Sequence, residues 1–221
     1  MWAVLASSGS TAALVIGIFG VMAITSEYTT SAVQSSLTVN PRRGMFYATK
    51  SVATALFALV AGIAGILLAA GVLWLFTRGH DITALTSDQS RIIPVTLIGF
   101  PLTIVLVSLM AQGLGGMTRS TVGGVCALIV LFMVLSSVLS ITSMAINQVE
   151  WLGTLSYLTP DTAMNHFLGA GIESSSQSTL AAAAKPHYWI PDWWQSVLIL
   201  LAWAAAAWAG GLIVTKKADI K

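Results

Sequence analysis

The chain has 221 residues, of which 56% are hydrophobic and only 8% are charged, and its mean hydropathy is +0.85. Soluble domains usually carry about a quarter of their residues as Asp, Glu, Lys or Arg. Ten basic and eight acidic side chains are too few to solvate a globule of this size. The composition excludes a soluble enzyme, a disordered chain and a disulfide scaffold, and it indicates an integral membrane protein.

Five segments are long and apolar enough to cross a bilayer as helices, each approaching or exceeding 20 residues. They cover residues 2–24, 51–76, 94–117, 122–146 and 195–214. These runs are continuously apolar rather than alternating, which favours helices over strands. We therefore expect an all-α integral membrane protein with a single transmembrane domain over residues 1–221, with a segment at 25–50 and longer loops at 77–93 and 147–194.

The chain begins with Met1 and Trp2 and enters the first span without a polar or basic flank, unlike a signal peptide. Two interpretations are open: a short tail outside the cell, or an upstream helix that is absent from this sequence.

The basic residues divide unequally between the two sides of this arrangement. Seven lie on one side: Arg42, Arg43, Lys50, Arg119, Lys216, Lys217 and Lys221. Three lie on the other: Arg78, Arg91 and Lys185. Because cytoplasmic loops carry the excess of Lys and Arg, we expect the C-terminus and the 25–50 segment in the cytoplasm and the N-terminus outside.

The 25–50 segment is the most informative part of the sequence. Ser26 can cap a helix with Glu27 in its first turn, and Pro41 would end that helix before Arg42 and Arg43. The pattern predicts an interfacial helix and elbow at the cytoplasmic headgroups. It serves either as a docking surface for a cytoplasmic partner or as a membrane-surface linker.

This segment resembles the signature of bacterial ATP-binding-cassette type-2 permeases, the membrane subunits of ATP-driven exporters. The matching residues are Glu27, Tyr28, Val33, Leu37, Pro41, Arg42, Arg43 and Lys50, whereas Ser31 and Ala32 stand where the family has Gly-Thr. A second match, at Tyr157-Leu158-Thr159-Pro160-Asp161-Thr162-Ala163, is similar to the family's short outer motif before the last span.

The resemblance implies a permease subunit in the bacterial plasma membrane that pairs with a second permease subunit, as a homodimer, among membrane lipids. A separate ATP-binding-cassette subunit would bind ATP and magnesium, and residues 27–43 would form the contact with it. The family plan has six spans and a cytoplasmic N-terminus, so the resemblance favours a first helix missing from this sequence.

The outer loop at 147–194 contains a second candidate element. Thr159 can cap a short helix that begins at Pro160 and ends at Gly169, with Ala163, Met164, Phe167 and Leu168 on one face. The resemblance implies that this helix closes the exit, with the gate formed by Pro160, Asp161, Ala163 and Phe167. The alternative is a capped surface helix without such a role.

Polar residues recur along one face of the fourth span: Ser136, Ser140, Ser143 and Asn147. They either form hydrogen bonds between helices or line a wet substrate path. Small residues also recur at four-residue spacing in three spans, where they pack helices within this subunit or between two subunits. These sets are Gly9, Ala13 and Gly17; Ala61, Gly65 and Ala69; and Ala202, Ala206 and Gly210.

No motif for chemistry is present, so we expect no catalytic site, cofactor or metal on this chain. The sequence has no Gly-rich loop with Lys and Ser/Thr for ATP phosphates, no metal-ligand spacing among its histidines, and no basic run for nucleic acid. Ionisable residues are absent from the predicted spans, which disfavours an ion-coupled transporter. Cys126 lies in an apolar run, where we expect it to be packed. The rival to an exporter subunit is a non-transport membrane scaffold or assembly protein.

Overall fold

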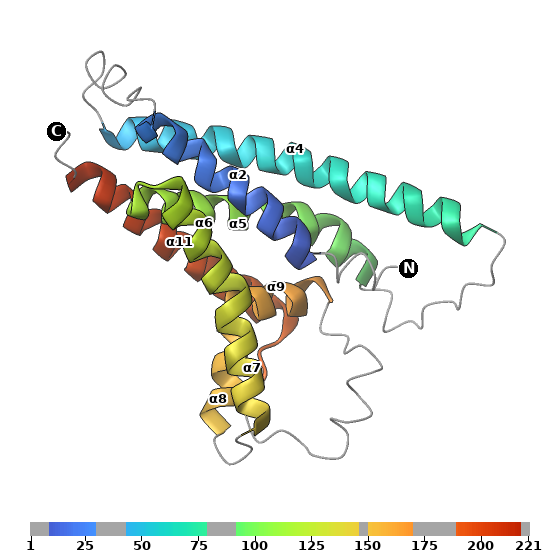
Figure 1. Cartoon of the computed structure of the whole chain (residues 1–221). Coiled ribbons are helices and arrows are strands. Elements are labelled where there is room, and N and C mark those ends of the chain that lie inside the picture. The colour runs from blue at the N-terminus through green and yellow to red at the C-terminus, as the bar shows by residue number, and fades with distance from the viewer. Residues whose placement is uncertain (1–8, 30–42, 79–91, 146–149, 170–188, 218–221) are drawn as a thin grey trace.

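The structure is a computed structural model that describes residues 9–29, 43–78, 92–145, 150–169 and 189–217 (Figure 1). The described residues form helices and no strands. The spanning helices are α2 (Gly9–Thr29), α4 (Arg43–Thr77), α5 (Ile92–Thr118), a fourth stretch in three parts, and α11 (Trp193–Lys217). The fourth stretch consists of α6 (Thr121–Ile129), the π-helix η2 (Val130–Val134) and α7 (Leu135–Ala145).

Five helical stretches of the described chain are long and apolar enough to span a membrane. The prediction of an all-α membrane protein is therefore confirmed. Two shorter helices, α8 (Glu150–Tyr157) and α9 (Pro160–Leu168), precede α11. The sequence predicted α9 but not α8.

Helix α5 is the centre of the bundle. Within the apolar stretch that makes α5 long enough to span a membrane, 56% of the residues are buried inside the chain. In the corresponding stretch of α4 only 17% are buried. Helices α2, α4 and α11 run alongside α5, and α6 to α7 crosses them and carries α8 away from the other helices (Figure 1). The core that results includes Val107, Met110 and Ala111 of α5 with Leu128 of α6 and Leu200 of α11.

Two glycines set how closely helices approach α5. A Cβ atom on Gly113 would lie 2.3 Å from the carbonyl oxygen of Ala207 in α11. A Cβ atom on Gly20 of α2 would lie 2.5 Å from the carbonyl oxygen of Ser108 in α5. Both contacts are with backbone, so only glycine allows these helix pairs to pack at this separation.

The predicted helix start at Ser26 is wrong. Helix α2 runs without interruption to Thr29, so Ser26 and Glu27 lie in its last turns rather than at the beginning of a new helix. No Gly or Pro stands between residues 24 and 29, and the Thr25 hydroxyl donates to the carbonyl of Val21 within the same helix. Since α4 already begins at Arg43, both ends of the predicted 25–50 elbow are helical, and residues 30–42 lie outside the described residues.

The small-residue sets serve different purposes in different helices. Ala13 is fully buried, and Gly9 and Gly17 of α2 contact Leu168 and Leu128 respectively, so this set packs within the chain. In α11, Gly210 contacts Met117, whereas Ala202 and Ala206 are exposed. Cys126 is exposed on α6, so the prediction that it is packed is also wrong.

Candidate functional site

The end of the bundle where α2 finishes and α4 begins holds several hydrogen-bonded and charged side chains. We call it the basic end and define it by Glu27, Tyr28, Lys50, Arg119 and Thr215. The opposite end, which carries α8 and α9, is called the α9 end. The two names describe the structure and assign neither end to a side of the membrane.

An ion pair joins α2 to α4 at the basic end. The carboxylate of Glu27 contacts Nζ of Lys50, and the side chains are 19% and 34% exposed respectively. A carboxylate in the last turn of a helix is disfavoured by the helix dipole, and the ammonium group from the neighbouring helix offsets this cost. Glu27 therefore has a partner within the chain and lies near the end of a helix, not at a helix start as we expected. Its contact with a separate subunit stays a prediction.

Further hydrogen bonds at the basic end connect α2 to α6 and α11. Tyr28 Oη lies 3.3 Å from Oγ1 of Thr215 in α11. The Thr121 hydroxyl donates to Oγ1 of Thr25 over 2.8 Å and so joins α6 to α2. These bonds, with the ion pair, hold the end of α2 against three other helices.

The turn between α5 and α6 makes one more connection at this end. Arg119 has a positive φ of 52° and its backbone N–H donates to the carbonyl of Gly115, which completes the last turn of α5. Its guanidinium donates to the carbonyl of Val214 near the end of α11, over 3.4 Å. A cation is favoured there because the last carbonyls of a helix carry partial negative charge.

The structure describes only part of the candidate coupling residues. Glu27 and Tyr28 make the contacts given above, and Arg43 is the first residue of α4. The other four predicted residues lie outside the described residues: Val33, Leu37, Pro41 and Arg42. Their role in contacting a partner stays a prediction.

At the α9 end, the short helix has the boundaries that the sequence predicted. Thr159 precedes it in an extended conformation, Pro160 is its first residue, and Gly169 ends it. The predicted face of Ala163, Met164, Phe167 and Leu168 is buried, and Pro160 is buried too. The Thr159 hydroxyl does not cap the helix backbone, however; it donates to the carbonyl of Ser156 over 2.9 Å instead.

Helix α9 packs as a wedge between α2, α5 and α11. The Phe167 ring lies against Gly99 of α5, at 2.8 Å from where a Cβ atom would stand, and stacks on Trp193 of α11 with 6.3 Å between ring centroids. The Thr96 hydroxyl of α5 donates to the carbonyl of Leu168 over 3.3 Å. Helix α9 therefore packs one face into the core of the bundle, as a helix that only lies on the surface would not.

Asp161, in the first turn of α9, is bonded to the start of α2. The Ser10 hydroxyl donates to Oδ1 of Asp161 over 2.7 Å, and Nδ2 of Asn165 donates to Ser10 Oγ over 2.8 Å. Burial raises the pKa of the Asp161 carboxyl, and the hydrogen bonds from Ser10 and Asn165 offset part of the rise. This cluster links the beginning of α2 to the predicted gate helix.

The fourth span meets the segment before α9 through one of its predicted polar residues. Ser136 is buried and donates to Oγ1 of Thr159 over 3.1 Å, which supports the interpretation as an interhelical bond. Ser143 instead donates to the carbonyl of Ser140 in its own helix. Asn147 lies outside the described residues.

The π-helix η2 ends at Val134, two residues before Ser136, and no feature of the sequence indicated it. A π-helical turn inserts a residue into the α-helical repeat and thereby rotates the side chains that follow. Such turns occur frequently at functional sites. Here the turn lies where the fourth span contacts α9, so both features belong to the same end of the molecule.

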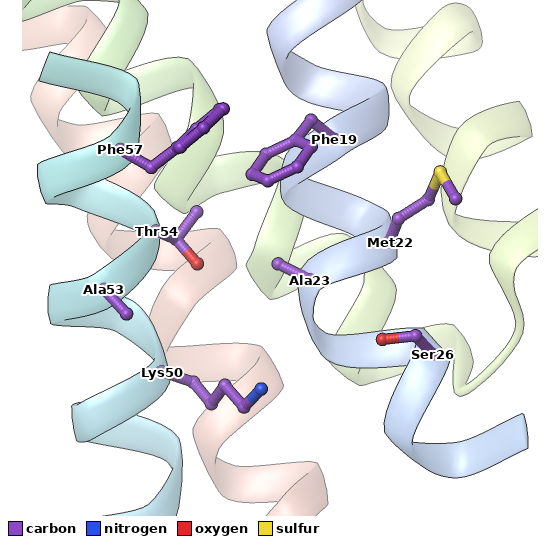
Figure 2. A pocket seen from close by; sticks show the side chains of 8 residues that line it. All are labelled: Phe19, Met22, Ala23, Ser26, Lys50, Ala53, Thr54 and Phe57. Atoms are coloured by element: carbon purple, nitrogen blue, oxygen red, sulfur yellow. The ribbon is translucent and has the colours of Figure 1, made fainter. Parts of the chain in front are cut away.

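A groove of about 410 Å³ lies between α2 and α4 (Figure 2). Helix α2 lines it with Phe19, Met22, Ala23 and Ser26, and α4 with Lys50, Ala53, Thr54 and Phe57. Phe19 and Phe57 stack with their ring centroids 4.3 Å apart. In Figure 2, Lys50 extends from α4 towards α2 at the opposite end from these rings, so the groove is apolar at one end and charged at the other.

A buried polar layer, which sequence reasoning missed, joins α4, α5 and α11. The Ser51 hydroxyl accepts from Nε1 of Trp208 over 2.7 Å and from Nε2 of Gln112 over 3.2 Å. Among the described residues, Gln112 Oε1 and Tyr47 Oη are buried without a hydrogen-bond partner. Gln112 and Trp208 lie within apolar runs, and nothing in the sequence around them pairs them with Ser51.

A scan against protein-family models finds no match for the chain, and a search of curated proteins finds none either.

Proposed function

We propose that the chain is the membrane-spanning permease subunit of an ATP-driven exporter in a bacterial plasma membrane, and that a separate ATP-binding-cassette subunit hydrolyses the ATP. The sequence pattern from Glu27 to Lys50 and the motif at residues 157–163 are the basis of the proposal. In it, residues 27–43 contact the ATPase, and α9 closes the exit at the other end of the bundle. A second copy of the chain completes the transporter.

The observation that carries the proposal is the set of side-chain contacts that joins α2 to α4 and α11 at the basic end. The last turn of α2 is joined to α4 by Glu27 and Lys50, and to α11 by Tyr28 and Thr215. Residues 30–42 connect α2 directly to α4, so a force on this connection reaches α2, α4 and α11 together. A coupling element needs such a rigid attachment, since a flexible one would absorb the movement.

The α9 wedge supports the exit role in the same way. It is seated between α2, α5 and α11, so a change in the separation of these helices alters the space that Phe167 and Leu168 occupy. Packed interfaces of this kind switch between discrete arrangements rather than deforming continuously. In the proposal, the ATPase therefore acts at one end of the bundle, and the exit for the substrate is opened and closed at the other end.

Co-purification tests the assignment. The tagged chain is isolated from its native membranes in mild detergent, with and without prior amine crosslinking, and the retained proteins are identified. We expect an ATP-binding-cassette ATPase that hydrolyses ATP in the isolated complex. Leu37→Asp should weaken its retention, and Lys217→Glu, a charge change on α11 outside the predicted contact, should not.

A complex without such an ATPase after crosslinking would reject the proposal in favour of a scaffold or assembly protein. Retention that is equal in the wild type and the Leu37→Asp variant would reject the coupling role of residues 27–43.

A further inference from the structure

The groove between α2 and α4 lies on a membrane-spanning part of the chain with a charge at one end. From Lys50 to Arg78, α4 and the residue after it carry no charged side chain over 27 intervening residues. At 1.5 Å per residue this is about 40 Å, close to the thickness of a bilayer with its headgroup regions. Arg78 lies over the ring of Trp74, 3.9 Å from its centroid, as a headgroup-level anchor would. Lys50 therefore stands at the opposite headgroup level.

The body of the groove faces the hydrocarbon of the bilayer. Phe19, Met22 and Phe57 are between 41% and 51% exposed although they belong to spanning helices. A hollow in such a surface loses dispersion contacts unless a flexible apolar chain fills it. The stretch of α2 from Phe19 to Ser26 is about 10 Å long, so the groove runs from the headgroup level into the acyl-chain region.

At the charged end of the groove, the ammonium group of Lys50 can donate further hydrogen bonds. Lys50 has three N–H donors, and Glu27 is its only ion-pair partner among the described residues. Its side chain is also the more exposed of the two, 34% against 19% for Glu27. Of the two charged groups of the pair, the ammonium group is therefore the more accessible to an anion.

We propose that this groove is a binding site for a glycerophospholipid, with one acyl chain along Phe19, Ala53 and Phe57 and the phosphate at Nζ of Lys50. The apolar body and the cationic end match the two parts of such a molecule in order and spacing. The site is a property of this chain alone and does not depend on an ATPase partner.

Photolabelling tests the position of the acyl chain. The full chain is reconstituted in nanodiscs of phosphatidylglycerol that contain a diazirine on one acyl chain, and the labelled peptides are mapped. We expect the label to concentrate on residues 19–26 and 50–57. Ala53→Trp, which fills the groove, should reduce it severalfold, while Ala64→Trp, on an exposed position of α4 outside the groove, should leave it unchanged. Even labelling of all lipid-facing helices, or equal labelling in the two tryptophan variants, would overturn the site.

The headgroup is tested with variants of the ion pair and with a matched diacylglycerol probe that lacks the phosphate. We expect groove labelling by the phospholipid to exceed that by diacylglycerol about two- to fivefold, as for a charged contact at a partly exposed site. The Glu27→Gln variant should keep or increase this preference, because it frees the ammonium group.

The double variant Glu27→Gln with Lys50→Gln should abolish the preference without leaving an unpaired charge in the fold. A preference that survives in the double variant would refute the role of Lys50. Competition by inorganic phosphate alone would identify a phosphate site and overturn the assignment to a lipid.

Discussion

At the scale of single residues, Gly113 illustrates how little tolerance the core of the bundle has. The atom nearest to a Cβ at this position is the carbonyl oxygen of Ala207, and backbone cannot move aside as a flexible side chain can. At Gly71 of α4, by contrast, nothing lies within 4 Å of the position that a Cβ atom would occupy. Replacing glycine by alanine at both sites therefore distinguishes the cost of overpacking between helices from the gain in helix propensity.

We expect Gly113→Ala to lower the free energy of unfolding by about 1–3 kcal/mol, the range for overpacking in a tight core. Gly71→Ala should be neutral or stabilising by up to about 1 kcal/mol, because alanine is the better helix former. Unfolding in mixed micelles measures both. Equal effects at the two sites would show that α5 and α11 are not packed this closely.

Asp161 gives a prediction about pH. Burial raises the pKa of its carboxyl above the ordinary value of 3.8, so the folded state binds the proton more tightly than the unfolded state does. The resulting stabilisation is fully present below the unfolded pKa and is lost as the pH rises through the folded pKa. Asp161→Asn should remove this part of the pH dependence.

Thermal unfolding of the wild type and the Asp161→Asn variant between pH 4 and pH 8 provides the measurement. We expect the difference in stability between them to shift in favour of the variant as the pH rises. A difference that stays constant over this range would mean that Asp161 ionises in the folded chain as it does in water.

At the scale of elements, α9 was predictable because its signals are local. Thr159, Pro160 and Gly169 mark its ends, and the apolar residues between them repeat at the helical period. The prediction of a helix start at Ser26 was wrong because a Ser followed by Glu also occurs inside a continuing helix. Whether Ser26 caps a helix depends on the backbone before it, and here that backbone was already helical.

The proposed gate leads to a prediction about crosslinking of α9 to α2. Ser10 and Asn165 contact each other, so cysteines at both positions in a Cys126→Ser background should form a disulfide on oxidation. If α9 moves relative to α2 during export, the disulfide should stop export and reduction should restore it.

The control is a second pair, Thr25→Cys with Thr121→Cys, at the basic end, where the native hydroxyls are 2.8 Å apart. Since the proposal treats these helix ends as one unit, this disulfide should leave most of the transport intact. Transport that continues with α9 locked would refute the gate.

At the scale of the whole molecule, the unequal distribution of Lys and Arg predicts that the basic end lies in the cytoplasm. Single cysteines in place of Lys217 and Asp192, both exposed and at opposite ends of α11, test this in a Cys126→Ser background. An impermeant thiol reagent added to intact cells should label the cysteine at 192 and spare the one at 217 until the membrane is opened. The reverse pattern would invert the topology.

The sequence by itself determined that this is a helical membrane protein with five spans and a short helix before the last. These features depend on the length of apolar runs and on local helix-boundary residues, which act over one or two helical turns. It also singled out Glu27 as part of a partner contact and Lys50 as a match to the family signature, but it did not pair the two residues with each other.

Only the tertiary structure decided which faces of these helices meet. The Glu27–Lys50 pair, the bond between Ser10 and Asp161, and the polar layer around Ser51 join residues that lie far apart in the chain. In an apolar helix nearly every face is hydrophobic, so periodicity does not mark the face that is buried. The choice is made by close approach at glycines and by the need of each polar group for a partner, and both depend on the three-dimensional arrangement of the helices.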